Sequence, residues 1–323
     1  MKFALACAAF LFSPSAFAAA NDFYADLFVP GMNMGTRAKL EQRNYGREFA
    51  AGRIFGLKQT RFDASIPVVK GEESSWRTTL FADYDAIESG ASFSNGRVMP
   101  NQLWEPGAGI SHTRNLPEGR SAGGSFSVSS PSDRPFSRAR DYGFNLNLTY
   151  RLPQADGNAW ILFLGVSNTR GFLPYVPMPG AAYFFKAGPK VRGLVGVPFG
   201  MIFWTPADLW TVTAFYFPIR VAELRVAYGS PRGIQPFAFV AYRGRNYRLF
   251  DRSNDKERLF MEEGVAQSGV SLPLYQGVLL ELSGGWSFGR KYFLAEKITD
   301  RSGAPSIAPD NALFGSAKLS SFF

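Results

Sequence analysis

The chain has 323 residues, a formal net charge of +9 and a mean hydropathy of −0.09, which is too polar for a bundle of membrane helices. Aromatic residues make up 15% of it, and Phe alone occupies 31 positions. One cysteine, Cys7, and one histidine, His112, exclude a disulfide framework and a Cys/His metal cluster, so only an all-oxygen metal site stays open.

The first residues predict a secretory signal peptide. One basic residue precedes an apolar run over 3–12, then come the helix breaker Pro14 and the small-residue site Ala16-Phe17-Ala18. We expect cleavage after Ala18, with Ala20 as a second site. Cys7 lies inside this signal, and the apolar stretch before it is too short for a lipoprotein signal. The mature chain is therefore predicted to be exported and to contain no cysteine.

Period-two alternation then runs along the chain. In residues 76–86, Trp76 and Leu80 share one face, whereas Arg77, Asp83 and Asp85 share the other. Ionised side chains can face a water-filled lumen, but they cannot face the core of a small sandwich without partners. This pattern favours a transmembrane β-barrel over a soluble sandwich.

The stretch 142–150 shows the same alternation, with a tyrosine at each end of its apolar face. Eight residues at roughly 3.3 Å each, tilted by about 45°, cover about 19 Å of an apolar band that is about 25 Å tall. We therefore expect Tyr142 and Tyr150 to lie near the two membrane–water interfaces.

We predict an all-β fold, a transmembrane up-and-down antiparallel β-barrel of about fourteen strands, within a range of about twelve to sixteen. Residues 1–18 are the signal peptide, 19–46 a periplasmic segment leading into the first strand, and 47–323 the barrel. The segment 36–46 can also extend the first strand. The predicted strands are 47–57, 59–70, 75–87, 105–115, 120–130, 140–151, 158–168, 191–204, 208–217, 219–229, 234–248, 259–272, 277–289 and 313–323.

Bacterial barrels have short periplasmic turns and long outer loops. With both chain ends in the periplasm, the long connections 88–104, 131–139, 169–190, 249–258 and 290–312 all fall on the outside. Two predicted outer connections, near 57–59 and 217–219, are short and mark places where the strand count can be wrong.

The C-terminal stretch LFGSAKLSSFF ends on Phe323 and places Leu313 and Leu319 on one face. It is similar to the terminal signal by which outer-membrane barrels are recognised for assembly, although Ser321 departs from the usual apolar residue. The assembly machinery of the outer membrane is therefore an expected partner.

Further stretches, GFLPYVPMPGAAYFF over 171–185 and the run 195–229, resemble an uncharacterised family of bacterial outer-membrane β-barrel proteins, a domain of unknown function. The stretch RNYRLFDRSNDKERLFMEE and the final Phe323 add to this resemblance, which covers about the C-terminal half. It implies a barrel in the outer membrane and brings no known substrate. A vaguer similarity runs to barrels that pass hydrophobic compounds inward.

Charged residues on inward-facing alternates are the candidates for lining a lumen, where they either shape a pore or pair across it and close it. They are Arg77, Asp83, Asp85, Glu223, Arg225, Arg243 and Glu281. The segment 169–190 is too apolar to extend into water, so it is predicted either to fold into the barrel mouth as a constriction or to pack against the rim or lipid. Its candidate residues are Phe172, Tyr175, Met178, Tyr183, Phe184 and Phe185.

Arginine clusters fall in the predicted outer rim. Guanidinium groups suit phosphate, so lipopolysaccharide is a candidate partner, and a merely solvated rim is the alternative. The candidates are Arg134, Arg138, Arg140, Arg245, Arg248 and Arg252. Nucleic acid is implausible at that location.

Two weaker motifs complete the candidate sites. His112 lacks a serine on its own face, because Ser111 and Thr113 point to the other, so a rim histidine is favoured over a catalytic one. The acidic run 251–262 has Lys256 where a calcium loop needs glycine, which favours a solvated, self-paired loop.

The sequence thus predicts an outer-membrane barrel with no cofactor, metal or catalytic residue. The first hypothesis is a passive channel for small solutes, biased toward apolar ones by the aromatic segment and toward anions by the basic rim. The alternatives are a closed structural or adhesive barrel without conductance and, less favoured, a lipid-modifying enzyme.

Overall fold

The computed structural model describes residues 35–218, 221–230 and 233–323, so the predicted signal peptide lies outside the described residues. Three short 3-10 helices lie in connections: η1 Pro117–Gly119, η2 Ala139–Asp141 and η3 Ile298–Arg301. The strands are β1 Arg37–Tyr45, β2 Glu48–Ala50, β3 Arg53–Lys70, β4 Ser74–Ser89, β5 Gln102–Asn115, β6 Ser121–Ser129, β7 Gly143–Pro153, β8 Ala159–Ser167, β9 Met178–Ala187, β10 Val191–Val197, β11 Gly200–Trp204, β12 Trp210–Phe217, β13 Val221–Tyr228, β14 Gln235–Tyr247, β15 Arg258–Tyr275, β16 Val278–Ala295, β17 Ser306–Ile307 and β18 Ala312–Phe322.

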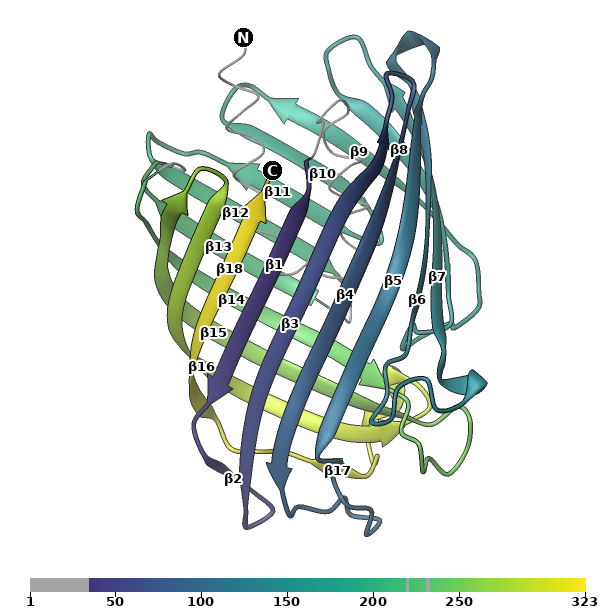
Figure 1. Cartoon of the computed structure of the whole chain (residues 1–323), viewed down its shortest axis with the longest axis vertical. Coiled ribbons are helices and arrows are strands. Elements are labelled where there is room, and N and C mark those ends of the chain that lie inside the picture. The colour runs from purple at the N-terminus through teal and green to yellow at the C-terminus, as the bar shows by residue number, and fades with distance from the viewer. Residues whose placement is uncertain (1–34, 219–220, 231–232) are drawn as a thin grey trace.

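The described strands form one antiparallel sheet that closes on itself (Figure 1). Closure is made by β18 and β1, where Leu319 lies opposite Leu40, and β1 in turn pairs with β3. Of the eighteen strands, β2 and β17 lie outside the ring, which therefore has sixteen. The predicted all-β antiparallel barrel is confirmed, and the predicted number of about fourteen strands is wrong.

The count differs in three places. The predicted strands 47–57 and 59–70 are mostly the single strand β3, and the preceding strand of the ring is β1, so the barrel begins at Arg37 and not at residue 47. The predicted strand 191–204 is the two strands β10 and β11, joined at Pro198 and Phe199. Finally, β9 occupies half of the segment predicted as the loop 169–190.

A hydrophobic cluster explains why these two features had no clear sequence signal. Phe199 is buried at 3% exposure inside it, so packing rather than polar turn residues holds the β10–β11 turn. The cluster also takes Ala182 and Phe184 of β9, whereas Tyr183 lies on the other face. Both faces of β9 are therefore apolar, and the polar–apolar alternation that marks other strands is missing.

The outer surface of the barrel is an apolar belt. Large apolar side chains lie exposed on the outward alternates, including Leu40, Phe62, Leu80, Ile110, Phe126, Leu146, Leu148, Leu162, Leu164, Ile202, Leu224, Val240, Leu282 and Leu319. An exposed apolar surface of this extent is stable against lipid and not against water. Within the three described ranges, no helix is long and apolar enough to span a membrane.

Aromatic side chains border the belt at both ends. Trp76, Trp160, Trp204, Trp210 and Tyr228 are exposed beside the turns at the end where β1 begins and β18 ends. Toward the opposite end, Tyr142, Tyr216 and Trp286 are exposed, and the rings of Tyr84 and Trp104 lie 4.0 Å apart. Two such girdles are typical of transmembrane barrels.

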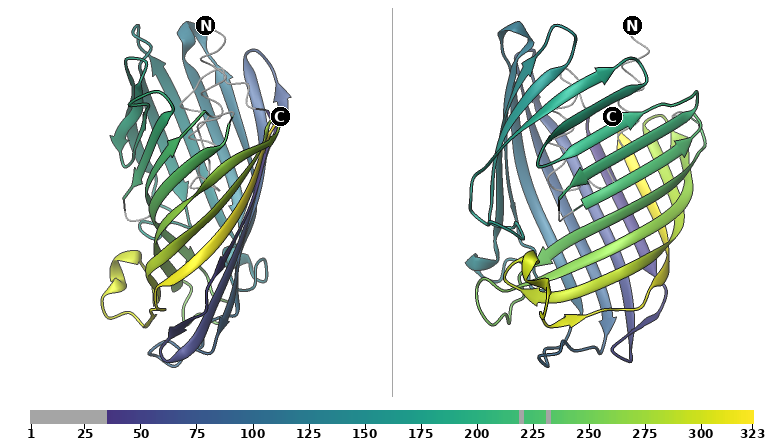
Figure 2. Two further views of the ribbon diagram at one scale, coloured as in Figure 1. Left: turned by 90° about the vertical axis from the view of Figure 1, so that its left-hand side faces the viewer. Right: turned by 180° about the vertical axis from the view of Figure 1, so that it is seen from behind.

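The connections differ sharply between the two ends (Figures 1 and 2). At the end where β1 begins and β18 ends, and where Phe323 donates a backbone hydrogen bond to Thr36, turns such as 71–73 and 276–277 are short. The opposite end carries the long connections 90–101, 130–142, 168–177, 248–257 and 296–311. The predicted segregation of long and short connections is thus present, with 168–177 in place of 169–190.

The wall has unequal height around the ring. Strands β3, β15 and β16 have 18 residues each, whereas β10 has 7 and β11 has 5. On the long-loop side, the described ladder of β13 and β14 reaches the pair Val221–Arg243, and β14 continues to Tyr247. In this last part of β14, Asn246 donates through Nδ2 to the carbonyl of Thr169 in the loop 168–177 at 3.0 Å.

Candidate functional site in the barrel interior

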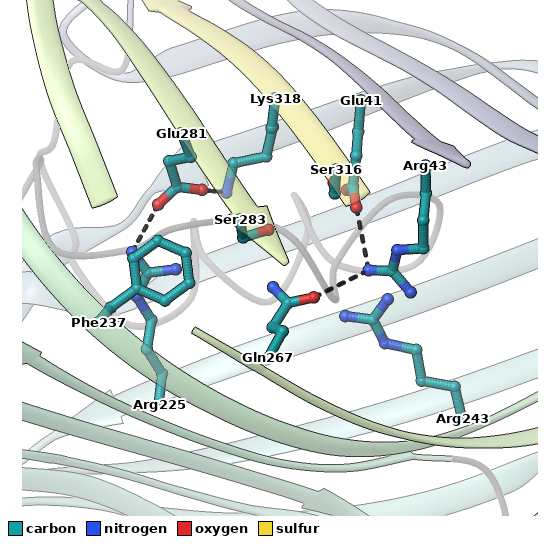
Figure 3. Close-up of a pocket in the computed structure, with 10 residues that line it drawn as sticks. All are labelled: Glu41, Arg43, Arg225, Phe237, Arg243, Gln267, Glu281, Ser283, Ser316 and Lys318. Carbon is teal, nitrogen blue, oxygen red and sulfur yellow. Dashed lines mark hydrogen bonds and ion pairs between the residues drawn. The ribbon is translucent and has the colours of Figure 1, made fainter. Parts of the chain in front are cut away.

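A group of ionised side chains lines a cavity inside the barrel (Figure 3). The walls of the cavity come from β1, β13, β14, β15, β16 and β18. Its lining is Glu41, Arg43, Arg225, Phe237, Arg243, Gln267, Glu281, Ser283, Ser316 and Lys318. This part of the inner surface is called the basic wall below.

Ion pairs organise the basic wall. Arg225 of β13 is bonded to Glu281 of β16, and β14 and β15 lie between these strands, so the pair runs through the interior. Glu281 also pairs with Lys318. Arg243 donates through Nε to Glu223 at 3.0 Å.

All seven predicted lumen residues lie on inward alternates. Arg77 is buried and donates to Ser65 Oγ at 3.0 Å. Asp83 lies 3.9 Å from Arg61 and 3.8 Å from Arg245. Asp85, Glu223, Arg225, Arg243 and Glu281 are engaged in the ion pairs of the interior.

One ion pair crosses the barrel. Arg245 of β14 lies 3.1 Å from Asp85 of β4, and Tyr247 donates to the same carboxylate at 3.3 Å. The strands β15, β16, β18, β1 and β3 separate β14 from β4 around the ring. The pair therefore joins two sides of the barrel through the interior.

The opposite inner surface is apolar. Buried side chains of β8 to β10 and of the β10–β11 turn form one hydrophobic cluster, with Phe163 and Phe199 rings 5.1 Å apart. The buried members are Ala159, Ile161, Ala182, Phe184, Leu194 and Phe199, with Phe163, Met201, Phe215 and Phe217 packed against them. The interior is thus amphipathic, with an apolar wall on β8 to β12 and the basic wall across from it.

The aromatic segment divides between a loop and a strand. Tyr183 faces outward, with its ring 5.0 Å from that of Trp160. Phe184 faces the interior, and Phe185 lies on the same outward face of β9 as Tyr183. Met178 begins β9, and only Phe172 and Tyr175 remain in the loop. Placing Tyr183, Phe184 and Phe185 in a constriction loop is therefore wrong, because β9 pairs on both edges with β8 and β10.

Buried arginines hold the loop end of the barrel together. Arg248 donates to the backbone carbonyl groups of Tyr142 and Asn168, each at 2.7 Å, and to that of Arg140 at 3.1 Å. Arg258 donates to the carbonyl of Asn168 at 2.8 Å, to that of Arg170 and to Asn246 Oδ1. We call this group of contacts the mouth clamp, because it joins the ends of β7, β8, β14 and β15.

An apolar plug lies beside the mouth clamp. Phe93 and Met99 of the connection 90–101 are buried to 2% and 1% exposure, against Phe55, Leu103 and Tyr292. Arg97 of the same connection pairs with Asp251 and Glu257. Two long connections are therefore joined across the mouth, and burying each large plug side chain stabilises that state by about 1.5–3 kcal/mol.

The rim arginines have two different environments. Arg134 and Arg138 lie over the ring of Phe250, at 4.7 and 3.6 Å, and Arg140 pairs with Asp255. Arg248 and Arg252 are buried, Arg245 is partly buried and pairs inward with Asp85, and Arg252 pairs with Asp141 at 2.6 Å. Placing these last three on an exposed rim is wrong, since carbonyl groups and carboxylates of the interior and mouth draw them inward.

The ion pair of Arg97 and Asp251 favours the charged forms of both side chains. Burial disfavours the charged guanidinium of Arg97, but hydrogen bonds to Asp251 and Glu257 outweigh it, so the pKa of Arg97 is raised. Burial opposes the charged form of Asp251 too, yet its hydrogen bond from Arg97 lowers its pKa below the ordinary 3.8.

His112 and the acidic run take places outside the interior. His112 lies near the short-turn end of β5, with its ring 4.3 Å from that of Trp76 on the outer face. Ser111 and Thr113 lie on the opposite face of β5. In the acidic run, Asp251 and Glu257 pair with Arg97, and Asp255 pairs with Arg140. Among the described residues, no group of His, Cys, Asp or Glu is arranged to hold a metal ion.

Sequence reasoning missed several residues of the basic wall. Lys39, Glu41 and Arg43 alternate on β1 and face inward, but this segment reads as periplasmic because Gln42 and Asn44 weaken its outer apolar face. Gln267 and Lys318 each sit on a predicted strand and could have been found from the inward alternation alone.

A closed antiparallel barrel with an apolar belt, two aromatic girdles and a charged interior defines a transmembrane β-barrel of the outer-membrane type. No protein-family model matches the chain. No curated protein matches it either.

Several solved barrels are similar over most of their length. An outer-membrane channel from Pseudomonas putida F1 has 8% identity over 91% of this chain and 99% of that one, with a TM-score of 0.39. The Pseudomonas putida toluene transporter TodX has 10% identity over 92% and 91%, with a TM-score of 0.40. The β domain of the Bordetella autotransporter BrkA has 9% identity over 90% and 100%, with a TM-score of 0.34. At these scores the fold assignment rests on this chain's own strand pairing.

Proposed function

We propose that this protein is an outer-membrane β-barrel that passes small solutes by passive diffusion. The observation that carries the proposal is the charged cavity inside the ring, which four cationic side chains and two carboxylates line. A barrel that serves only as a scaffold can fill its interior with apolar side chains, as soluble cores do. Ionised groups around empty space instead favour water and polar solutes.

The amphipathic interior supports small solutes with both apolar and charged parts. The apolar wall offers Phe163, Phe184 and Leu194, and the basic wall offers guanidinium and ammonium groups. The mouth clamp and plug then form the narrowest part of the path. A path through them requires movement of the long connections, which is slower than motion of side chains alone.

A closed structural or adhesive barrel is the second candidate. The cross-barrel pair of Arg245 and Asp85, together with the plug of Phe93 and Met99, favours it. Paired charges that span a lumen occupy the space that a solute needs. The two candidates therefore differ in one property, which is conductance.

Single-channel recording in a planar bilayer separates them. We expect the refolded wild type to give small, discrete openings. The double variant with Phe93→Ala and Met99→Ala should give larger openings, because it empties the plug. Val98→Ala is the matched control, since Val98 is 61% exposed in the same connection and its change should leave the openings unaltered. Silence of both wild type and double variant, with insertion verified, favours the closed barrel.

The location in the outer membrane, the cleaved signal peptide and assembly through the barrel-assembly machinery belong to this proposal. Phe323 is 70% exposed and available as a terminal signal. Of the six rim arginines, Arg134, Arg138 and Arg140 remain candidates for contact with lipopolysaccharide phosphates, since they lie in the connection 130–142 at the loop end. Loss of lipopolysaccharide binding on their joint change to Gln would support that contact.

A further inference from the structure

Two buried guanidinium groups face the same cavity without a carboxylate between them. Arg43 of β1 is 2% exposed and Arg243 of β14 is 8% exposed, and both line the cavity. Figure 3 shows their guanidinium groups side by side, with Gln267 next to Arg43. Like charges in a poorly solvated interior repel one another, so this arrangement needs an opposing charge.

The nearby carboxylates are already engaged. Glu41 accepts from Arg43 at 3.2 Å and lies 3.9 Å from Lys39. Glu223 binds Arg243 through Nε. The lining has four cationic side chains and two carboxylates, Glu41 and Glu281, and Glu223 beside Arg243 adds a third, which leaves one positive charge in excess.

Hydrogen-bond donors of both arginines are also left over. In the described part of the chain, Arg43 Nε and Arg243 Nη1 are buried and have no hydrogen-bond partner. The bonds that Arg43 does make, to Tyr45, Glu41 and Gln267, are long at 3.2–3.4 Å. A buried charged donor without a partner is destabilising, so a partner that supplies acceptors there would bind favourably.

Aromatic rings lie next to the two guanidinium groups at cation–π distances. Arg43 lies 4.5 Å from the centre of the Phe314 ring, and Arg243 lies 5.4 Å from that of Phe239. Phe237 is buried in the lining itself. A ligand at this place meets donors on one side and apolar surface on another.

We propose that Arg43 and Arg243 form a binding site for a small organic carboxylate. The carboxylate oxygens would accept from both guanidinium groups, and the apolar body of the anion would lie toward Phe237. The inference rests on the proposed function in that the anion would be a passing solute. It names the class of solute and a place where that solute pauses.

Equilibrium binding tests the site without relying on conduction. We would titrate benzoate into the refolded full-length protein in detergent and measure binding by calorimetry, with folding verified by circular dichroism and heat-modifiable gel migration. Arg43→Gln and Arg243→Gln should each weaken benzoate binding by about tenfold or more, the scale of a lost charged hydrogen bond. Benzyl alcohol, which lacks the charge, should not bind.

Arg77→Gln is the matched control, because it removes one inward positive charge at Ser65, away from the cavity lining. Unchanged benzoate binding in this variant together with loss in the other two supports the site. No benzoate binding by the folded wild type, or an equal loss in all three variants, overturns it. If Arg243→Gln fails to fold, Arg243→Lys keeps the charge and loses the planar fork, and should still weaken binding. Binding without conductance would refute the channel and leave the site standing.

Discussion

Arginine is buried in two regions of this barrel, and its surroundings differ between them. In the mouth clamp, Arg248 and Arg258 direct their donors at backbone carbonyl groups and at Asn246. In the cavity, Arg43 and Arg243 face each other and each keeps a donor without a partner among the described residues. The first arrangement stabilises the fold, and the second is suited to receive an anion.

The difference follows from whether the backbone near each arginine has carbonyl groups that need a donor. The ends of β7 and β8 leave carbonyl groups without strand partners, and a guanidinium satisfies several of them at once. Within the cavity the backbone is paired in the ladders β1–β18 and β14–β15, so side-chain groups alone are available to the arginines there. A buried charge therefore adds stability where the backbone needs donors and not where it is already paired.

The largest expected effect lies in the mouth clamp. Arg248→Met removes three hydrogen bonds to backbone carbonyl groups, although that of Asn168 keeps Arg258 as a donor and that of Tyr142 keeps Asn168 Nδ2. We expect the free energy of unfolding to fall by about 1–3 kcal/mol. Urea unfolding in detergent micelles measures this loss. Arg134→Met is the control, because Arg134 is exposed in the same mouth and should change stability little. Equal losses in both variants would remove the distinction between clamp and rim.

The cavity should respond differently to the same kind of change. Arg43→Gln removes one of two facing positive charges, and Glu41 keeps Lys39 as a partner at 3.9 Å. We therefore expect the free energy of unfolding to change by no more than about 1 kcal/mol in either direction. The same urea series measures it. A loss as large as that of Arg248→Met would mean that Arg43 is a structural residue and would weaken the comparison.

The comparison also explains what the sequence could predict. The belt, the closed barrel and the inward charges follow from period-two alternation, which depends on local sequence alone. Residues such as Arg77, Asp83 and Glu281 were found in this way. The partners of those charges depend on which strands meet across the ring, and no local pattern carries that information.

The same limit applies to strands that lack alternation. The turn at Pro198 and Phe199 and the strand β9 depend on a shared hydrophobic cluster, which forms only when the chain is folded. The inward position of Arg245 and the burial of Arg248 and Arg252 depend likewise on carbonyl groups and carboxylates from distant segments. Sequence alone placed these arginines on the rim because a cluster of positive charge next to a loop is most often solvated.

The smallest expected effect on stability lies at the outer edge of the mouth, where Arg97 pairs with Asp251. The pKa of Asp251 is lowered in the folded protein, so its pairing contributes stability above its ordinary pKa of 3.8 and loses that contribution as pH falls further. Asp251 is 68% exposed at its side chain, so solvent screens the pair and the contribution is small. We expect wild type to have a higher urea midpoint than Asp251→Asn at pH 6, with the two midpoints converging below about pH 4. Added salt should shrink the difference at pH 6. If the midpoints of the two proteins stay separated by the same amount down to pH 2.5, the carboxylate of Asp251 does not act through its charge, and the mouth is held by the clamp and plug alone.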